Sequence, residues 1–535
     1  MKQSILIKNI YNKYLEVSIY IYYLALILIP IGLLFSRAML SIGYIALFAN
    51  WFLEGEYEQK WKLFKQHKDK MLISIIFLIH MIGMLNTENI EYGFLDLKIK
   101  LPLLLPLFFG SSPKLLNIIK SSVFTYLFAV STLVATLVGF IKFEYILKYQ
   151  TIDDIKNITF MGQNIMLSLF VNFSIFIFLS YIYQNWFKSR IIFRIGLLVC
   201  LLWLIVFLYL LNSLTGYITF IFLILYSLIY IIVKLKKKTI TISIFIIVGL
   251  SVFTFSTYVN RIVHGFYEKE TINFDNLDKK TANGRPYLHN TERKRTENSH
   301  YIDVYICMDE LEKEWGNVSS LNIYGEDKKG QVLSETLIRY LSSKGLRKDS
   351  AGLNQLKPFE IAYIENGCAN YKYINKYSLE SRIYIIIWQL NTYIQTGNAS
   401  AQSISQRIDY LKSAKHIIKE NFWFGVGTGD VKDVFDETLT KLSPELASKN
   451  RYRVHNQYIV VFTALGIISF IVFMIALFYP IFHQKIWNNY IFTIFYLIIL
   501  LAFFTDNPME TQLGVGFFAY FYCLNAFNNH HSKSL

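Results

Sequence analysis

The sequence predicts an all-α polytopic membrane protein, with about twelve transmembrane helices and one large, mostly helical loop outside the membrane. Of its 535 residues, 54% are hydrophobic and only 17% are charged, whereas soluble domains carry about 25% charged residues. The hydrophobic residues also gather in blocks such as Val17–Phe35, which approach the roughly 20 residues that cross a bilayer as a helix. These observations exclude a wholly soluble protein.

Twelve apolar blocks are predicted to be the spans, and the fourth, which begins at Leu101-Pro102, is short enough to be a tilted or half helix. The predicted spans are 17–35, 38–53, 71–86, 100–110, 121–142, 163–183, 191–211, 216–233, 239–257, 456–479, 487–505 and 511–527. The chain then divides into three regions. These are an N-terminal transmembrane bundle of about nine helices at 1–257, a large outward loop at 258–455 with a catalytic segment at 403–455, and C-terminal transmembrane helices at 456–535.

The positive charge lies mainly at the ends of the apolar blocks. The formal net charge is +15. The connecting segments rich in lysine or arginine, such as Lys60–Lys70, fall on one side of the membrane if both termini are cytoplasmic. The large loop would then be periplasmic and the protein would reside in a bacterial inner membrane. No basic stripe interleaved with aromatic residues occurs in a soluble segment, so nucleic-acid binding is not expected.

The outward loop has a polar first part and a helical last part. Residues 260–350 show no steady periodicity, and no function is predicted for them. Cys307 and Cys368 share the loop, and the sequence leaves open whether they pair. From Ser403 onward, apolar residues recur at helical spacing, and a run of glycines ends that predicted helix.

Five basic residues stand at the outer membrane edge, and one of them, Arg261, follows the ninth predicted span. Lys98 and Lys100 adjoin the start of the fourth predicted span, and Arg451 and Arg453 precede the tenth. Outward cations run against the positive-inside trend, so they indicate an anionic ligand at the outer leaflet, such as a lipid-linked pyrophosphate. The alternative is that each side chain snorkels to lipid phosphates. The sequence leaves both interpretations open.

Two residues of the catalytic segment are the sharpest candidates. Arg407 lies in the first turn of the predicted helix, where free N–H groups and the helix dipole favour an anion, and its guanidinium could bind phosphate bidentately. His455 lies where the loop re-enters the membrane, and a histidine can take a proton from a hydroxyl. The alternative is that Arg407 is an ordinary surface residue and His455 an ordinary interfacial one.

Neither a nucleotide nor a metal is expected. The run Phe424-Gly-Val-Gly-Thr-Gly429 follows a helix instead of opening one, so a tight turn is favoured over a phosphate cradle. There is no His/Cys cluster at zinc spacing. The first outward turn, near Ser36-Arg37, is too short for an acidic metal motif. We therefore expect no metal and no cofactor.

The order of these motifs resembles the core of the O-antigen ligase and polymerase superfamily. The matching stretches are Ser405-Gln-Arg407-Ile-Asp-Tyr-Leu, then Asn421-Phe-Trp-Phe-Gly-Val-Gly-Thr-Gly429, then His455-Asn-Gln-Tyr458 before Leu465-Gly466. Two further stretches, around Tyr92–Pro102 and Asp506-Asn-Pro-Met-Glu510-Thr-Gln, are similar to forms seen in Bacteroidetes members. No single motif is specific, but their order around one outward loop is.

The resemblance implies a GT-C-like membrane glycosyltransferase that needs neither metal nor ATP. Such an enzyme moves a glycan from undecaprenyl pyrophosphate to an acceptor hydroxyl, with inversion, at the periplasmic face. The acceptor is lipid A–core in ligases and another lipid-linked chain in polymerases. Carried over by position, Arg407 would hold the donor pyrophosphate and His455 would activate or orient the acceptor. Asn456, Tyr458, Gly425 and Gly427 would shape the acceptor side of the site.

The sequence departs from the family pattern at one position, and it leaves other functions open. Many members carry Ser-Arg after the seventh span, where this chain has Ser213-Leu214, so Lys98, Lys100, Arg451 or Arg453 would have to supply that cation. A polymerase or a protein O-oligosaccharyltransferase would share the scaffold and the donor. A lipid-linked glycan flippase is the non-enzyme alternative, although its ionisable groups would be expected near the bilayer midplane.

Overall fold

The computed structural model describes residues 2–119, 122–149, 163–235, 238–375, 378–397, 399, 403–446 and 448–528. In this part of the chain the secondary structure is almost entirely helical, with one two-stranded sheet. Eight described helices are long and apolar enough to cross a membrane, and Arg37–Leu53 and Tyr490–Thr505 are shorter apolar helices. The prediction of an all-α polytopic membrane protein is therefore confirmed, whereas the count of twelve spans stays a prediction.

The chain forms two compact units. The first consists of residues 1–234 and 398–535, and the second of residues 235–397. The helices of the first unit are α1 (Lys2–Phe35), α2 (Arg37–Leu53), α3 (Tyr57–Met71), α4 (Ile75–Gly83), α5 (Ile90–Lys100), α6 (Leu105–Ser111), α7 (Pro113–Ile118), α8 (Val123–Tyr149), α9 (Asn164–Asn185), α10 (Ile191–Leu211), α11 (Leu214–Leu235), α18 (Ser403–Glu420), α19 (Val431–Leu442), α20 (Gln457–His483), α21 (Tyr490–Thr505) and α22 (Gln512–Ala526). Short 3₁₀ turns connect several of them, at Leu72–Ser74, Met84–Asn86, Leu101–Leu104, Ser448–Asn450, Ile486–Asn488 and Pro508–Glu510.

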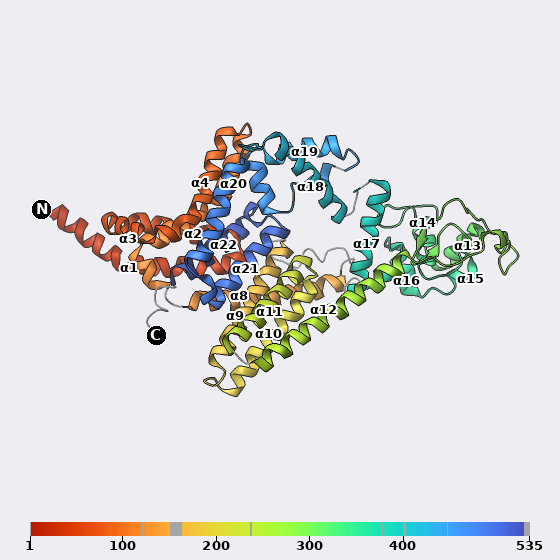
Figure 1. The fold of residues 1–535 in the computed structure, drawn as a ribbon, viewed down its shortest axis with the longest axis horizontal. Coiled ribbons are helices and arrows are strands. Elements are labelled where there is room, and N and C mark those ends of the chain that lie inside the picture. The colour runs from red at the N-terminus through yellow and green to blue at the C-terminus, as the bar shows by residue number, and fades with distance from the viewer. Residues whose placement is uncertain are drawn as a thin grey trace. The chain divides into compact units, whose positions relative to one another are not determined.

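The core of the first unit is built around the last helix, α22. Every residue from Leu513 to Ala526 is buried, as expected for a helix that is apolar on all sides. Helix α22 contacts α1, α6 and α21. Helices α4 and α20 lie side by side (Figure 1). Helices α18 and α19, which precede α20 in the chain, both pack on it.

The proline-containing segment predicted as the fourth span is divided in the structure. A 3₁₀ turn at Leu101–Leu104 precedes the short helix α6, and Pro102 and Pro106 each stand in the first turn of one of these elements. Proline lacks the N–H that would continue a helix but is tolerated in its first turn. This explains why the block is too short for a regular span. Residue 121, where the fifth predicted span begins, lies outside the described residues.

The second unit contains a folded region in the segment for which the sequence predicted no function. Its elements are α12 (Lys238–Tyr267), β1 (Thr296–Glu297), β2 (His300–Tyr301), α13 (Met308–Val318), α14 (Leu333–Ser343), α15 (Ser350–Leu353), α16 (Pro358–Glu365) and α17 (Leu379–Thr396), with 3₁₀ turns at Phe274–Asn276 and Tyr371–Tyr373. Trp315, Leu337 and Leu341 lie at the centre of an apolar cluster with residues of α13, α14 and α16. Cys307 and Cys368 are not disulfide-bonded.

Candidate functional site

The glycine run forms a tight turn that lies against the backbone of α20 on one side and the segment around Asn86 on the other. The N–H groups of Val426 and Gly427 donate to the carbonyls of Thr463 (3.0 Å) and Ala464 (2.9 Å) in α20. The carbonyl of Gly425 accepts from the Asn86 amide (2.9 Å). Because these N–H donors already bond to α20, the turn does not offer them to a phosphate. It is the close-approach turn that the sequence favoured, and the surface it approaches is protein.

Glycine is required at this turn for two reasons. Gly425 has φ +71°, and a Cβ there would lie 2.4 Å from the carbonyl of Ala464. We expect Gly425→Ala to destabilise the first unit by more than the ~1–2 kcal/mol that left-handed backbone alone costs a residue with a Cβ, because the clash adds to it. Thermal unfolding in detergent measures the loss. Gly196→Ala is the control, because a Cβ added at that helical site in α10 would meet no neighbouring atom within 4 Å. An unchanged unfolding midpoint for both variants would contradict the close packing at Gly425.

His455 is positioned by the connection between α21 and α22. Its Nδ1 lies 3.1 Å from Oδ1 of Asp506, the residue that follows α21. The next residue, Asn456, caps α20 through Ile459 N–H (3.0 Å) and donates to the carbonyl of Phe504 (3.0 Å). An ionised carboxylate only accepts hydrogen bonds, so Nδ1 carries the proton in this pair. In the neutral imidazole Nε2 is then the acceptor.

Arg407 reaches the same connection from α18. Its Nη1 donates to the carbonyl of Thr505 (3.2 Å), and the side chain is exposed. Thr505 and Asp506 are consecutive, so the structure brings Arg407 and His455 to adjacent residues. Tyr410, one helical turn beyond Arg407, places its ring 6.0 Å from the His455 ring and donates to the carbonyl of Asn450 (2.5 Å).

Helix α18 differs from its prediction in two details. It begins at Ser403, so Arg407 lies in its second turn and not at its first free N–H groups; the residues just before the helix, and the Ser403 side chain, lie outside the described part. The buried face also differs. Ser405, Asp409 and Ser413 are buried although polar, whereas Leu411 is 46% exposed. The apolar spacing therefore predicted the helix but not its orientation.

Two of the predicted pyrophosphate-binding cations are committed to carboxylates. The Lys100 ammonium lies 2.6 Å from Asp96 and 3.4 Å from Glu510. Arg453 lies 2.7 Å from Glu510 and donates to the Tyr92 hydroxyl (2.8 Å). Burial alone would raise the pKa of Glu510, but the two cations hold it below its ordinary range. Two positive and two negative groups balance, so this cluster is not a free cationic patch.

The remaining predicted residues do not converge on one ligand. Lys98 is exposed. Arg451 donates to the carbonyl of Leu446 (3.1 Å) and to the Thr440 hydroxyl (2.7 Å). Tyr458 donates to the carbonyl of Leu500 (3.3 Å), so it supports the junction of α20 and α21. No group of three or more His, Cys, Asp or Glu side chains in the described part of the chain is placed to hold a metal ion.

Asp506 and Glu510 are the site residues that sequence reasoning did not assign. Gln457 links them, because its N–H donates to the carbonyl of Asp506 (3.0 Å) and its side chain donates to Glu510 (3.1 Å). Their position in the sequence could have identified them. Two acidic residues flank an Asn-Pro turn between two apolar blocks, where an unpartnered carboxylate would be costly.

The fold and this site define a polytopic α-helical membrane protein in which helix α18 and the segment before α20 bring an arginine and a histidine to the acidic turn between α21 and α22. Residues 371–474 match the family model described as O-antigen ligase, and this match supports the O-antigen ligase superfamily. The matched segment includes Arg407 and His455 but not Asp506. No curated protein matches the chain.

Proposed function

We propose that the protein is an O-antigen ligase-type glycosyltransferase. It transfers a glycan from undecaprenyl pyrophosphate to an acceptor hydroxyl, with lipid A–core as the acceptor, at the periplasmic face of the inner membrane. The match of residues 371–474 to the O-antigen ligase family model supports a ligase- or polymerase-type activity in general. The donor, the acceptor and the direction of the loop are part of the proposal.

One observation carries the proposal: the His455–Asp506 pair with Arg407 beside it. An imidazole whose Nδ1 is held by a carboxylate presents a basic Nε2 in a fixed direction. The His455 side chain is 32% exposed, so a substrate can reach the imidazole. Among the residues that the structure describes, Arg407 uses one of its five N–H donors, on Thr505, and the others can bind an anion.

The reaction balances without a further reactant. The acceptor hydroxyl oxygen attacks the anomeric carbon and forms the new glycosidic bond, and its proton passes to Nε2 of His455. The bond from the anomeric carbon to pyrophosphate breaks, and the leaving oxygen takes the electron pair. Attack opposite the leaving group inverts the anomeric centre. Arg407 stabilises the charge that gathers on the pyrophosphate, which is where a fixed cation contributes most.

Deletion of the gene, followed by complementation, tests this function. We expect the deletion strain to accumulate undecaprenyl-linked glycan and to lose the long chains of its lipopolysaccharide. Wild-type protein should restore them, and Arg407→Ala should not, because the charge on the leaving group loses its partner. Lys415→Ala, an exposed cation on the same helix, is the control.

The lipid products separate the proposed activity from its relatives. Lipopolysaccharide that keeps a single repeat unit would identify a polymerase. Normal lipopolysaccharide with under-glycosylated secreted proteins would identify a protein O-oligosaccharyltransferase. Full restoration by Arg407→Ala, at equal protein level, would contradict the role of Arg407.

A further inference from the structure

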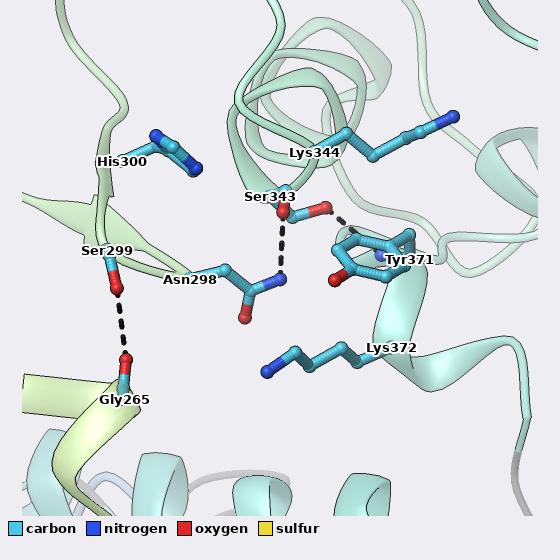
Figure 2. Close-up of a pocket in the computed structure, with 8 residues that line it drawn as sticks. All are labelled: Gly265, Asn298, Ser299, His300, Ser343, Lys344, Tyr371 and Lys372. Carbon is cyan, nitrogen blue, oxygen red and sulfur yellow. Dashed lines mark hydrogen bonds between the residues drawn. The ribbon is translucent and has the colours of Figure 1, made fainter. Parts of the chain in front are cut away.

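The second unit contains a polar pocket that is made entirely from its own residues. It has a volume of about 260 Å³ and is lined by Gly265, Asn298, Ser299, His300, Ser343, Lys344, Tyr371 and Lys372, as Figure 2 shows. A second pocket of about 470 Å³ shares Lys344, Tyr371 and Lys372 with it and adds Phe359. Small-molecule sites usually have volumes of roughly 300–1,000 Å³. The first pocket is smaller than this range, and the second lies in its lower part. Together they suit a ligand made of small linked units.

The floor of the pocket is rigid because its turn is fixed by hydrogen bonds. Asn298 and Ser299 form the two-residue turn between β1 and β2, with φ of +47° and +76°. The Asn298 amide donates to the carbonyl of Ser343 (2.9 Å) and the Ser299 hydroxyl to the carbonyl of Gly265 (3.0 Å) (Figure 2). Asn370 exchanges amide hydrogen bonds with Asn298. A ligand would therefore meet polar groups already held in place.

The ionisable groups of the pocket are each paired with a carboxylate. The Lys344 ammonium lies 2.9 Å from Glu360, and the Lys372 ammonium lies 3.1 Å from Glu380. An ammonium has three donors, so each lysine is oriented by its partner and keeps at least one donor for a ligand.

The imidazole is held in the same way. Nδ1 of His300 lies 2.7 Å from Glu270. Gly345, with φ +70°, makes room for the ring, because a Cβ there would lie 2.9 Å from it. The lysine charges are thus compensated, and what the pocket offers is directed hydrogen bonding more than net charge.

Two exposed aromatic rings lie among these polar groups. Tyr371 is 41% exposed and Phe359 is 51% exposed, although large aromatic side chains normally bury their faces. Tyr371 lines both pockets. An apolar ring face beside fixed, neutralised hydrogen-bonding groups matches the two surfaces of a sugar ring, which has C–H groups on its faces and hydroxyls at its edge.

We propose that this pocket binds an uncharged sugar residue of a glycan, with Tyr371 under the ring and Lys344 and Lys372 bonding its hydroxyls. The inference goes beyond the proposed function, because it assigns a glycan-binding site to the second unit, whereas Arg407 and His455 belong to the first. Binding at this site does not require transfer.

Ligand-observed NMR and calorimetry on the full chain in detergent test this proposal. The probes are the methyl glycosides of glucose, N-acetylglucosamine and glucuronic acid, and inorganic phosphate. We expect saturable binding of at least one neutral glycoside, weakened about tenfold or more by Tyr371→Ala and by Lys372→Gln through loss of stacking or a hydrogen bond. Arg407→Ala should bind as the wild type does, which separates this inference from the transfer reaction.

A matched control removes the effect of breaking a surface ion pair. Lys328→Gln breaks a pair of the same kind, Lys328–Glu365 at 3.2 Å, in the same unit but outside both pockets, and it should leave binding unchanged. Tyr371→Ala disrupts no side-chain hydrogen bond with a described residue, so a folding defect is not expected. Absence of neutral-glycoside binding, binding of phosphate or glucuronide alone, or equal losses in Lys328→Gln would overturn the proposal.

Discussion

Replacing His455 with alanine is expected to lower the rate of glycan transfer by about 10²–10⁴-fold, the usual contribution of a general base. The reason is geometric. Nδ1 is held 3.1 Å from Asp506, so Nε2 is the ring nitrogen that can take the acceptor proton. The measurement is transfer from a lipid-pyrophosphate donor in proteoliposomes, with kcat and KM determined separately. The loss should fall on kcat, because the proton moves only in the transition state.

Asp506 is a positioning residue, and a second substitution tests that role. Asp506→Asn keeps the size of the side chain but lets an amide donate to Nδ1, which favours the opposite tautomer of His455. We expect kcat to fall while the KM for the donor changes little. A purely structural role would instead lower the amount of folded protein and leave kcat per folded molecule unchanged.

The control for both variants is a second histidine of the first unit. His416 on α18 is exposed and pairs with Glu420 at 3.3 Å, so it has the same kind of acidic partner without the neighbouring arginine. His416→Ala should transfer as the wild type does. Activity retained by His455→Ala would rule out the proton transfer to His455 and would leave positioning by Arg407 as the principal contribution.

The sequence predicted the membrane fold because hydrophobic blocks report bilayer crossing directly. It could also place Arg407 and His455 in one predicted catalytic segment, 403–455, next to the tenth predicted span. It could not show that the two meet at Thr505–Asp506. That meeting depends on the register of α18 against α20 and α21, which apolar spacing along one helix does not encode.

The polar segment 260–350 illustrates a different limit. Its helices α13 and α14 are short. Their buried residues, such as Trp315 in α13 and Leu337 in α14, belong to an apolar cluster whose members are far apart in the chain. Each helix does carry apolar residues at helical spacing, such as Leu333, Leu337 and Leu341 in α14, but it spans only 11 residues, so the periodic signal is brief. Packing between elements, and not local propensity, defines this unit and the pocket within it.

The charge cluster at α5 shows why a basic residue at a membrane edge need not bind a ligand. Lys98 and Lys100 are two residues apart and look equivalent in sequence. In the structure Lys98 is exposed, whereas Lys100 is 1% exposed and lies between Asp96 and Glu510. Residues two apart on a helix point to different sides. Lys100 faces inward toward Glu510, and a contact between residues so far apart in the sequence cannot be predicted from the sequence around Lys100.

Lys100→Ala is therefore expected to destabilise the first unit by about 3–5 kcal/mol, because it leaves Asp96 buried without its cation. A fall in the thermal unfolding midpoint in detergent measures this, and it should occur without any donor present. Lys98→Ala is the matched control and should change stability by no more than about 0.5 kcal/mol, as exposed sites usually do.

A compensating variant distinguishes a structural cation from a donor-binding one. Replacing both partners, Lys100→Met with Asp96→Leu, removes the buried pair together and should recover much of the stability lost in Lys100→Ala. Glu510 would keep Arg453 at 2.7 Å. If Lys100→Ala instead unfolded at the wild-type temperature and raised the KM for the donor, Lys100 would have to turn toward the pyrophosphate. The ion pair with Asp96 would then contribute nothing to the stability of the fold.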